Sequence, residues 1–259
     1  MRQKFISYHK VNRNVELSLF FYILLFIVAF LYASVGHGGA SGYLALMALF
    51  NMDPGIMKPT ALLLNLFVSL TAFIQFYRGG HFKWRIFLPF ALASIPLSFI
   101  GGLVSLDVVV YKKILGVLLL IPVARFLFTP KGRNEQLNEP NVWMSVLIGA
   151  LIGLLSGLIG IGGGIILSPV LLLMGWTNQK QTAAISALFI FVNSLAGLGG
   201  QMAKGVDLDT GMVSMVGIAF VGGLLGAWFG ALKFNHRVLQ YSLAIVLALA
   251  SFKLLFTGA

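Results

Sequence analysis

Long runs of apolar residues, separated by short polar breaks, cover most of the chain. The runs fall near 17–35, 40–51, 59–77, 86–104, 108–128, 142–159, 164–175, 181–203, 211–231 and 237–257. Most approach the length of about 20 residues that a helix needs to cross the hydrocarbon core of a bilayer. The runs 40–51 and 164–175 are shorter, and as helices they would span only about 18 Å. The pattern predicts an all-α polytopic membrane protein in which two short helices are broken or re-entrant.

Composition agrees with this prediction. Of the 259 residues, 59% are hydrophobic and 10% are charged, whereas a soluble domain carries roughly 25% charged residues. The mean hydropathy is +0.95. The net charge of +11 comes from lysines and arginines in the tails and loops, where they set the orientation of a membrane protein. We therefore expect a lipid bilayer and no nucleic acid as the partner. The chain has no cysteine, which excludes disulfides and thiol chemistry.

The chain also divides into two similar halves. The glycines at 36, 38 and 39 match those at 160, 162 and 163 with an offset of 124 residues. Two further matches follow in the same order, 58–61 with 180–183 and 69–70 with 194–195. Three ordered matches indicate a duplication. We predict a basic cytoplasmic segment at 1–16, a first transmembrane repeat at 17–128, a polar linker at 129–141 and a second repeat at 142–259.

The basic residues give a preference among topologies. If each short segment continues its predecessor as one broken crossing, eight crossings result, with 12 of the 18 lysines and arginines inside and six outside. Ten full crossings divide them nine to nine. The positive-inside rule therefore favours eight crossings, about four in each of two parallel repeats. Re-entrant short segments fit the charges equally well, and an odd number of crossings per half, which would invert the repeats, stays open.

The two glycine clusters are the main candidates for a binding site. Glycine lets backbone N–H groups approach a ligand closely, and the N-terminus of the helix that follows attracts anions. Ser41 adds a hydroxyl group in the first turn after the first cluster. The alternative is close helix packing through small residues. The candidate residues are Gly36, His37, Gly38, Gly39, Gly160, Gly162, Gly163 and Gly164.

Other polar residues in apolar segments could add to such a site. Buried amides need hydrogen-bond partners, so Asn65, Gln75, Asn193 and Gln201 either line a polar path or join helices. His37 could relay a proton, donate to an anion or cap a helix. The seven acidic residues all lie at segment ends or in loops. The lack of a carboxylate in mid-membrane argues against a carboxylate proton relay or a sodium site, and favours a small anionic solute.

Two other functions are alternatives to transport. The stretch Gly39-Ala40-Ser41-Gly42 resembles the nucleophile motif of rhomboid intramembrane proteases. Such a serine needs a histidine from a later helix, but His81 and His236 lie beside charged loop residues. A passive anion channel is the other alternative. No zinc, haem or nucleotide-binding pattern is present, so we expect no cofactor.

Around the glycine clusters the chain resembles the TauE/SafE family of membrane permeases, the sulfite exporters. The stretches that carry the resemblance are 36–42 and, more clearly, Gly157-Leu158-Ile159-Gly160-Ile161-Gly162-Gly163-Gly164-Ile165-Ile166-Leu167-Ser168-Pro169. The resemblance implies a secondary transporter of the bacterial inner membrane that moves sulfite or organosulfonates, usually by export. It agrees with alternating access around a site between the two halves. Whether the chain forms a homodimer stays open.

Overall fold

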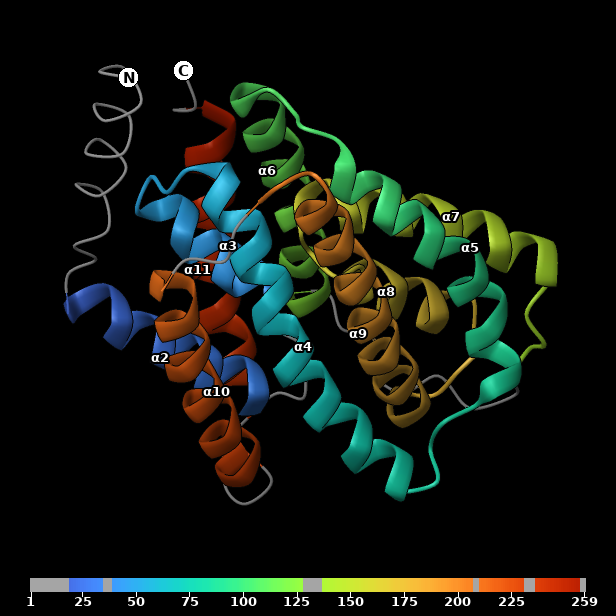
Figure 1. Cartoon of the computed structure of the whole chain (residues 1–259). Coiled ribbons are helices and arrows are strands. Elements are labelled where there is room, and N and C mark those ends of the chain that lie inside the picture. The colour runs from blue at the N-terminus through green and yellow to red at the C-terminus, as the bar shows by residue number, and fades with distance from the viewer. Residues whose placement is uncertain (1–18, 35–38, 128–136, 207–209, 231–235, 257–259) are drawn as a thin grey trace.

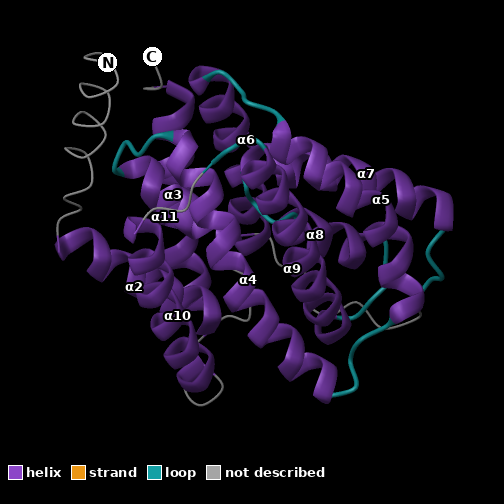
Figure 2. Cartoon of the chain, in the orientation of Figure 1, coloured by secondary structure: helices purple, strands orange, loops and turns teal. Residues whose placement is uncertain are grey.

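The computed structural model describes residues 19–34, 39–127, 137–206, 210–230 and 236–256. All the regular elements in these ranges are helices (Figures 1 and 2). They are α2 (Leu19–Ser34), α3 (Ala40–Leu49), α4 (Pro54–Arg78), α5 (Trp84–Leu103), α6 (Val108–Leu127), α7 (Val142–Ile159), α8 (Gly164–Leu173), α9 (Gln179–Ala203), α10 (Thr210–Gly230) and α11 (His236–Phe256). Four of them, α4, α5, α7 and α9, are long and apolar enough to cross a membrane. The prediction of an all-α membrane protein is confirmed.

Polar caps extend two helices beyond the apolar runs from which they were predicted. Helix α4 begins at Pro54, where the Asp53 side chain accepts a hydrogen bond from the Gly55 N–H at 2.7 Å. Helix α9 begins at Gln179 with a capping box between Asn178 and Gln181. A cap satisfies backbone N–H groups that have no partner within the helix. Because such caps are polar, hydropathy alone places both helix starts too late.

Helices α4 and α9 cross the middle of the molecule side by side and run in opposite directions (Figure 1). Near their middles, Asn65 donates to the hydroxyl of Ser194 at 3.2 Å. Near the start of α4 and the end of α9, Lys58 and Gln201 both donate to the Gly102 carbonyl. Each helix has 25 residues. The duplication stays a prediction. If α4 and α9 are equivalent helices of two repeats, their opposite directions are those that inverted repeats produce.

Glycine seams hold two further helix pairs together. Helix α7 lies parallel to α5, and α2 packs on α10 in the same way. In the first pair, glycines spaced four residues apart place their Cα atoms directly against the backbone of α5, as small residues do between membrane helices. The facing positions are Gly149 with Phe90, Gly153 with Ser94 and Gly157 with Ser98 in the first pair, and Gly222 with Phe26 and Gly226 with Phe30 in the second.

The short helix α8 turns back beside its neighbours. Its first residue, Gly164, lies against Ile190 of α9, and one turn later Ser168 pairs with Ser186 at 2.8 Å. Helix α8 is therefore antiparallel to α9. Because α7 and α9 both run parallel to α5, α8 also reverses the direction of α7. These contacts favour the re-entrant arrangement of this segment over its continuation of α7 as one broken crossing.

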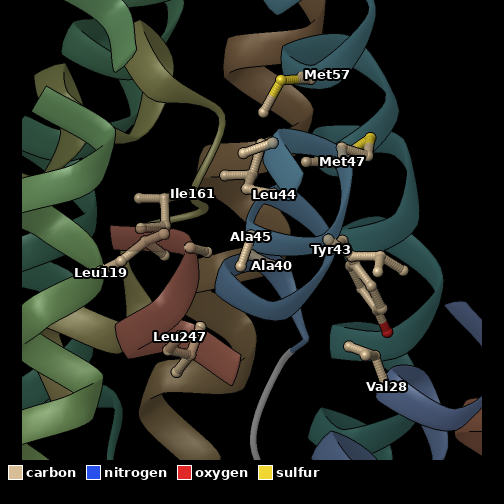
Figure 3. Close-up of a cluster of buried hydrophobic side chains, with 14 of the residues drawn as sticks. Val28, Ala40, Tyr43, Leu44, Ala45, Met47, Met57, Leu119, Ile161 and Leu247 are labelled. Atoms are coloured by element: carbon tan, nitrogen blue, oxygen red, sulfur yellow. The ribbon is translucent and has the colours of Figure 1, made fainter. Parts of the chain in front are cut away.

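The other short helix, α3, lies in the centre of the larger apolar cluster. Nine of its ten residues, Ala40–Ala48, are buried. Its Leu44 and Ala45 lie close to Leu119 of α6 and to Ile161 of the segment between α7 and α8 (Figure 3). The second glycine cluster therefore lies beside the helix that follows the first.

Candidate functional site

Glycine makes the sharp turn between α7 and α8 possible. Gly160 ends α7 with φ of 86°, and Gly162 and Gly163 follow with φ of 75° and 77°. These are left-handed conformations that cost a residue with a Cβ atom about 1–2 kcal/mol. The interruption that the sequence predicts after Ile159 is thus present, and three of its four residues are glycines with positive φ. We call residues 160–165, the turn and the first residues of α8, the glycine loop.

Side chains from α4, α7 and α9 enclose the glycine loop tightly. A Cβ atom on Gly162 would lie 2.7 Å from the Asn65 amide nitrogen and 3.1 Å from the Ser194 hydroxyl. A Cβ atom on Gly163 would lie 2.7 Å from Ile152 and 2.9 Å from Phe189. Any side chain at these two positions would displace its neighbours, so the packing as well as the backbone conformation requires glycine there.

The glycine loop carries backbone N–H groups that have no hydrogen-bond partner. Residues 161–165 are all buried. The backbone hydrogen bonds around the turn are donated by residues on either side of them: the Gly160 N–H donates to the Ser156 carbonyl, and the Ile166 N–H donates to the Gly163 carbonyl. In the part of the chain that the structure describes, none of these five N–H groups donates to another residue. More than nine-tenths of buried backbone N–H groups in proteins are paired. A run of unpaired donors at a helix N-terminus is the arrangement that binds anions.

Several buried side-chain oxygens on the helices around the glycine loop also lack a partner among the described residues. The side-chain oxygens of Asn65, Asn193 and Ser156 are buried without a partner among the described residues, and the three residues are at most 1% exposed. Asn65 lies against Gly162. Asn193 donates to the carbonyl of Phe189 at 2.8 Å, and Phe189 contacts Gly163. Asn65 therefore adds an unsatisfied acceptor beside the unsatisfied donors, and Asn193 and Ser156 add two more on α9 and α7, the helices that flank the loop.

A lysine lies against the glycine loop. The described carboxylates have partners of their own, since Asp53 and Asp107 cap helix N-termini and Glu139 pairs with Arg85 at the surface. A Cβ atom on Gly160 would lie 3.1 Å from the Cα atom of Lys58. Lys58 is only 6% exposed, although the charge count from sequence treats it as a loop residue. A buried lysine that packs against the start of a loop with unpaired N–H donors favours a negatively charged ligand.

The first glycine cluster is only partly described. Gly36, His37 and Gly38 lie outside the described residues. Gly39 precedes the first residue of α3 and lies against the ring of Tyr43. The hydroxyl of Ser41 is fully buried and pairs with the hydroxyl of Tyr32 at 2.8 Å. Ser41 therefore has a tyrosine as its hydrogen-bond partner, whereas the protease hypothesis requires a histidine.

The two glutamines fall in different places from the asparagines. Gln75 is exposed, about 15 Å along α4 from Asn65 at 1.5 Å per residue, so the structure does not bring it to the glycine loop. Gln201 is buried and donates to the Gly102 carbonyl beside Lys58. Ser156 and Lys58 are absent from the candidate residues of the sequence analysis. The sequence signal for Ser156 is a hydroxyl group one turn before Gly160. The signal for Lys58 is a lysine close to the start of a long apolar run.

Comparisons with known proteins agree on one kind of protein. A family model described as sulfite exporter TauE/SafE matches residues 21–254. The probable membrane transporter protein y4hK of Sinorhizobium fredii is 36% identical over 90% of this chain and 96% of that protein. The probable membrane transporter protein YunE of Bacillus subtilis is 24% identical over 80% of this chain and 83% of that protein. A probable membrane transporter protein of Haemophilus influenzae is 28% identical over 84% and 85%. No solved structure matches the chain.

Proposed function

The chain belongs to the sulfite exporter TauE/SafE family, and from this membership we propose that it is a secondary transporter of small sulfur-containing anions. It moves sulfite or organosulfonates across the bacterial inner membrane, in the direction of export, by alternating access. The glycine loop holds the anion. The five unpaired N–H groups of residues 161–165 are the single observation that carries this assignment.

The unpaired acceptors refine the choice of solute. An oxyanion accepts hydrogen bonds from the backbone N–H groups, but it offers nothing to the oxygens of Asn65 and Asn193 unless it also carries an O–H or N–H group. A protonated oxyanion, or a sulfonate with a hydroxyl or amino substituent, pairs with both kinds of group. We therefore expect such solutes to be preferred over sulfonates that have only acceptor atoms.

Burial of the glycine loop implies that the protein moves during transport. Residues 160–165 are all buried, so a solute reaches them only when the surrounding helices separate. In alternating access, rigid groups of helices rock around a fixed site. The antiparallel pair α4 and α9, which contributes Asn65 and Ser194, is the natural boundary for such a movement. When the helices separate at one end of the α4 and α9 pair, the glycine loop becomes accessible from one side of the membrane only.

Flux into proteoliposomes tests the proposed function. We expect saturable uptake of radiolabelled sulfite, and faster uptake of a hydroxyl- or amino-substituted alkanesulfonate than of the unsubstituted one. Empty liposomes and a panel of simple carboxylates provide the controls. A flux that rises linearly with concentration would point instead to a passive channel, and the absence of flux with every sulfur oxyanion would reject the assigned substrate class.

A carboxylate at position 65 should block anion transport. Asn65→Asp is nearly isosteric, but it places a negative charge against Gly162, where we expect the anion. Like charges at close range in a buried site repel strongly, so we expect the initial rate of uptake to fall at least tenfold. Gln75→Glu makes the same change of amide to acid on the same helix at an exposed position, and should keep a rate near that of the wild type. Equal losses in both variants would contradict the placement of the site.

A further inference from the structure

Lys58 is a buried cation whose partners are all neutral. Its ammonium group donates to the carbonyl oxygens of Gly101, Gly102 and Val104 at 3.2, 3.4 and 3.2 Å. These carbonyls lie at the C-terminal end of α5, where the helix dipole is negative. In the part of the chain that the structure describes, the one ion pair joins Arg85 to Glu139. The positive charge of Lys58 is therefore not neutralised by a carboxylate there.

The three contacts hold the ammonium group loosely. N–H···O hydrogen bonds in proteins have lengths of about 2.7–3.2 Å, and the bonds of Lys58 lie at or beyond the upper end of this range. The Gly102 carbonyl also accepts a bond from Gln201, so it keeps a partner if Lys58 moves away. The lysine side chain is a flexible stem with a compact charge at its tip. It can exchange neutral carbonyls for an anion at little cost to its neighbours.

Lys58 also lies at the entrance of the turn that forms the glycine loop. Its backbone and Cγ atom are within about 3 Å of a Cβ position on Gly160. Asn65, which contacts Gly162, follows Lys58 by seven residues and so lies two turns further along the same face of α4. One face of α4 thus packs the stem of a lysine and an amide against two positions of the same loop.

We infer that the Lys58 ammonium group is the counter-charge of the transported anion. When the anion occupies the glycine loop, Lys58 leaves the carbonyls of α5 and binds it, and Gln201 keeps the Gly102 carbonyl paired. This inference rests on the proposed function, because it assigns a further binding residue to the same anion site. Anion binding then releases the C-terminal end of α5 from Lys58, so this end of α5 is the part of the protein that responds to binding.

Thermal unfolding in detergent with increasing sulfite tests the inference, since a ligand that binds the folded state raises its melting temperature. We expect Lys58→Met to need roughly tenfold to hundredfold more sulfite for half of the maximal shift, the effect of losing a hydrogen bond to a charged group. Lys58→Gln keeps a donor for the α5 carbonyls but not the charge, and should show the same loss. Lys180→Met is the matched control, because Lys180 lies in the first turn of α9, as Lys58 lies near the start of α4, and is exposed.

The outcomes separate the inference from the function on which it rests. If Lys58 only clamps α4 to α5, Lys58→Gln would bind sulfite as the wild type does, and Lys58→Met would lower the melting temperature without changing the sulfite dependence. Either result overturns the inference while leaving anion transport in place. If the wild-type protein shows neither a sulfite-dependent shift nor sulfite flux, the proposed function fails, and the inference fails with it.

Discussion

Replacing Gly162 with alanine should abolish anion uptake while the protein still inserts and folds. The added methyl group would lie 2.7 Å from the amide nitrogen of Asn65 and 2.9 Å from Ile190, so it pushes both groups away from the loop. It also adds the cost of a left-handed alanine, about 1–2 kcal/mol. We expect at least a tenfold loss of initial sulfite uptake in proteoliposomes, measured on protein that elutes as a single species in detergent.

Gly80→Ala separates the loss of the site from the backbone cost. Gly80 has φ of 73° and nothing within 4 Å of its Cβ position. An alanine there carries a similar conformational cost but touches no neighbour. We expect Gly80→Ala to show only the smaller drop in melting temperature that the backbone cost produces, Gly162→Ala to show a larger drop because it adds the clashes, and normal uptake only in Gly80→Ala. If Gly162→Ala transports sulfite at the wild-type rate, the glycine loop is not the anion site.

The helices of the fold could be predicted from the sequence because a bilayer requires apolar segments of a minimum length. Apolar runs of spanning length give helices, and a cluster of glycines after Ile159 gives the break that is observed. The direction of the short helix α8 could not be predicted in the same way. Ten residues of helix fit equally well as the continuation of a crossing or as its return, and only the contacts of Gly164 with Ile190 and of Ser168 with Ser186 decide between them.

Parts of the candidate site could be predicted from the sequence, but only where the chemistry of a residue and its burial coincide. Asn65 and Asn193 are amides in apolar helices, and the burial of both makes their side chains informative. Gln75 has the same chemistry, but its helix turns it outward. Lys58 was assigned to a loop because the positive-inside rule counts lysines as topology signals. Its burial depends on the end of α5 reaching the start of α4, a tertiary contact that no local pattern encodes.

The glycine seam between α5 and α7 should be the part of the fold least tolerant of substitution. A Cβ atom on Gly157 would overlap the Ser98 carbonyl and lie 2.8 Å from the Gly102 amide nitrogen. Both atoms belong to the backbone, so no change of rotamer relieves the clash and the two helices must move apart. Overpacking of a core typically costs 1–3 kcal/mol, and we expect Gly157→Ala to reach the upper end of this range, about 3 kcal/mol.

Gly217→Ala is the control for the loss of stability expected in Gly157→Ala. It makes the same change inside α10, at a position where an added Cβ atom has nothing within 4 Å. Alanine is favoured over glycine in a helix by about 0.5–1 kcal/mol, so Gly217→Ala should unfold at or slightly above the wild-type temperature. Thermal unfolding in detergent measures both variants. Equal stability in Gly157→Ala and Gly217→Ala would mean that α5 and α7 separate freely, and the seam would then be a sliding surface of the transport cycle rather than a fixed joint.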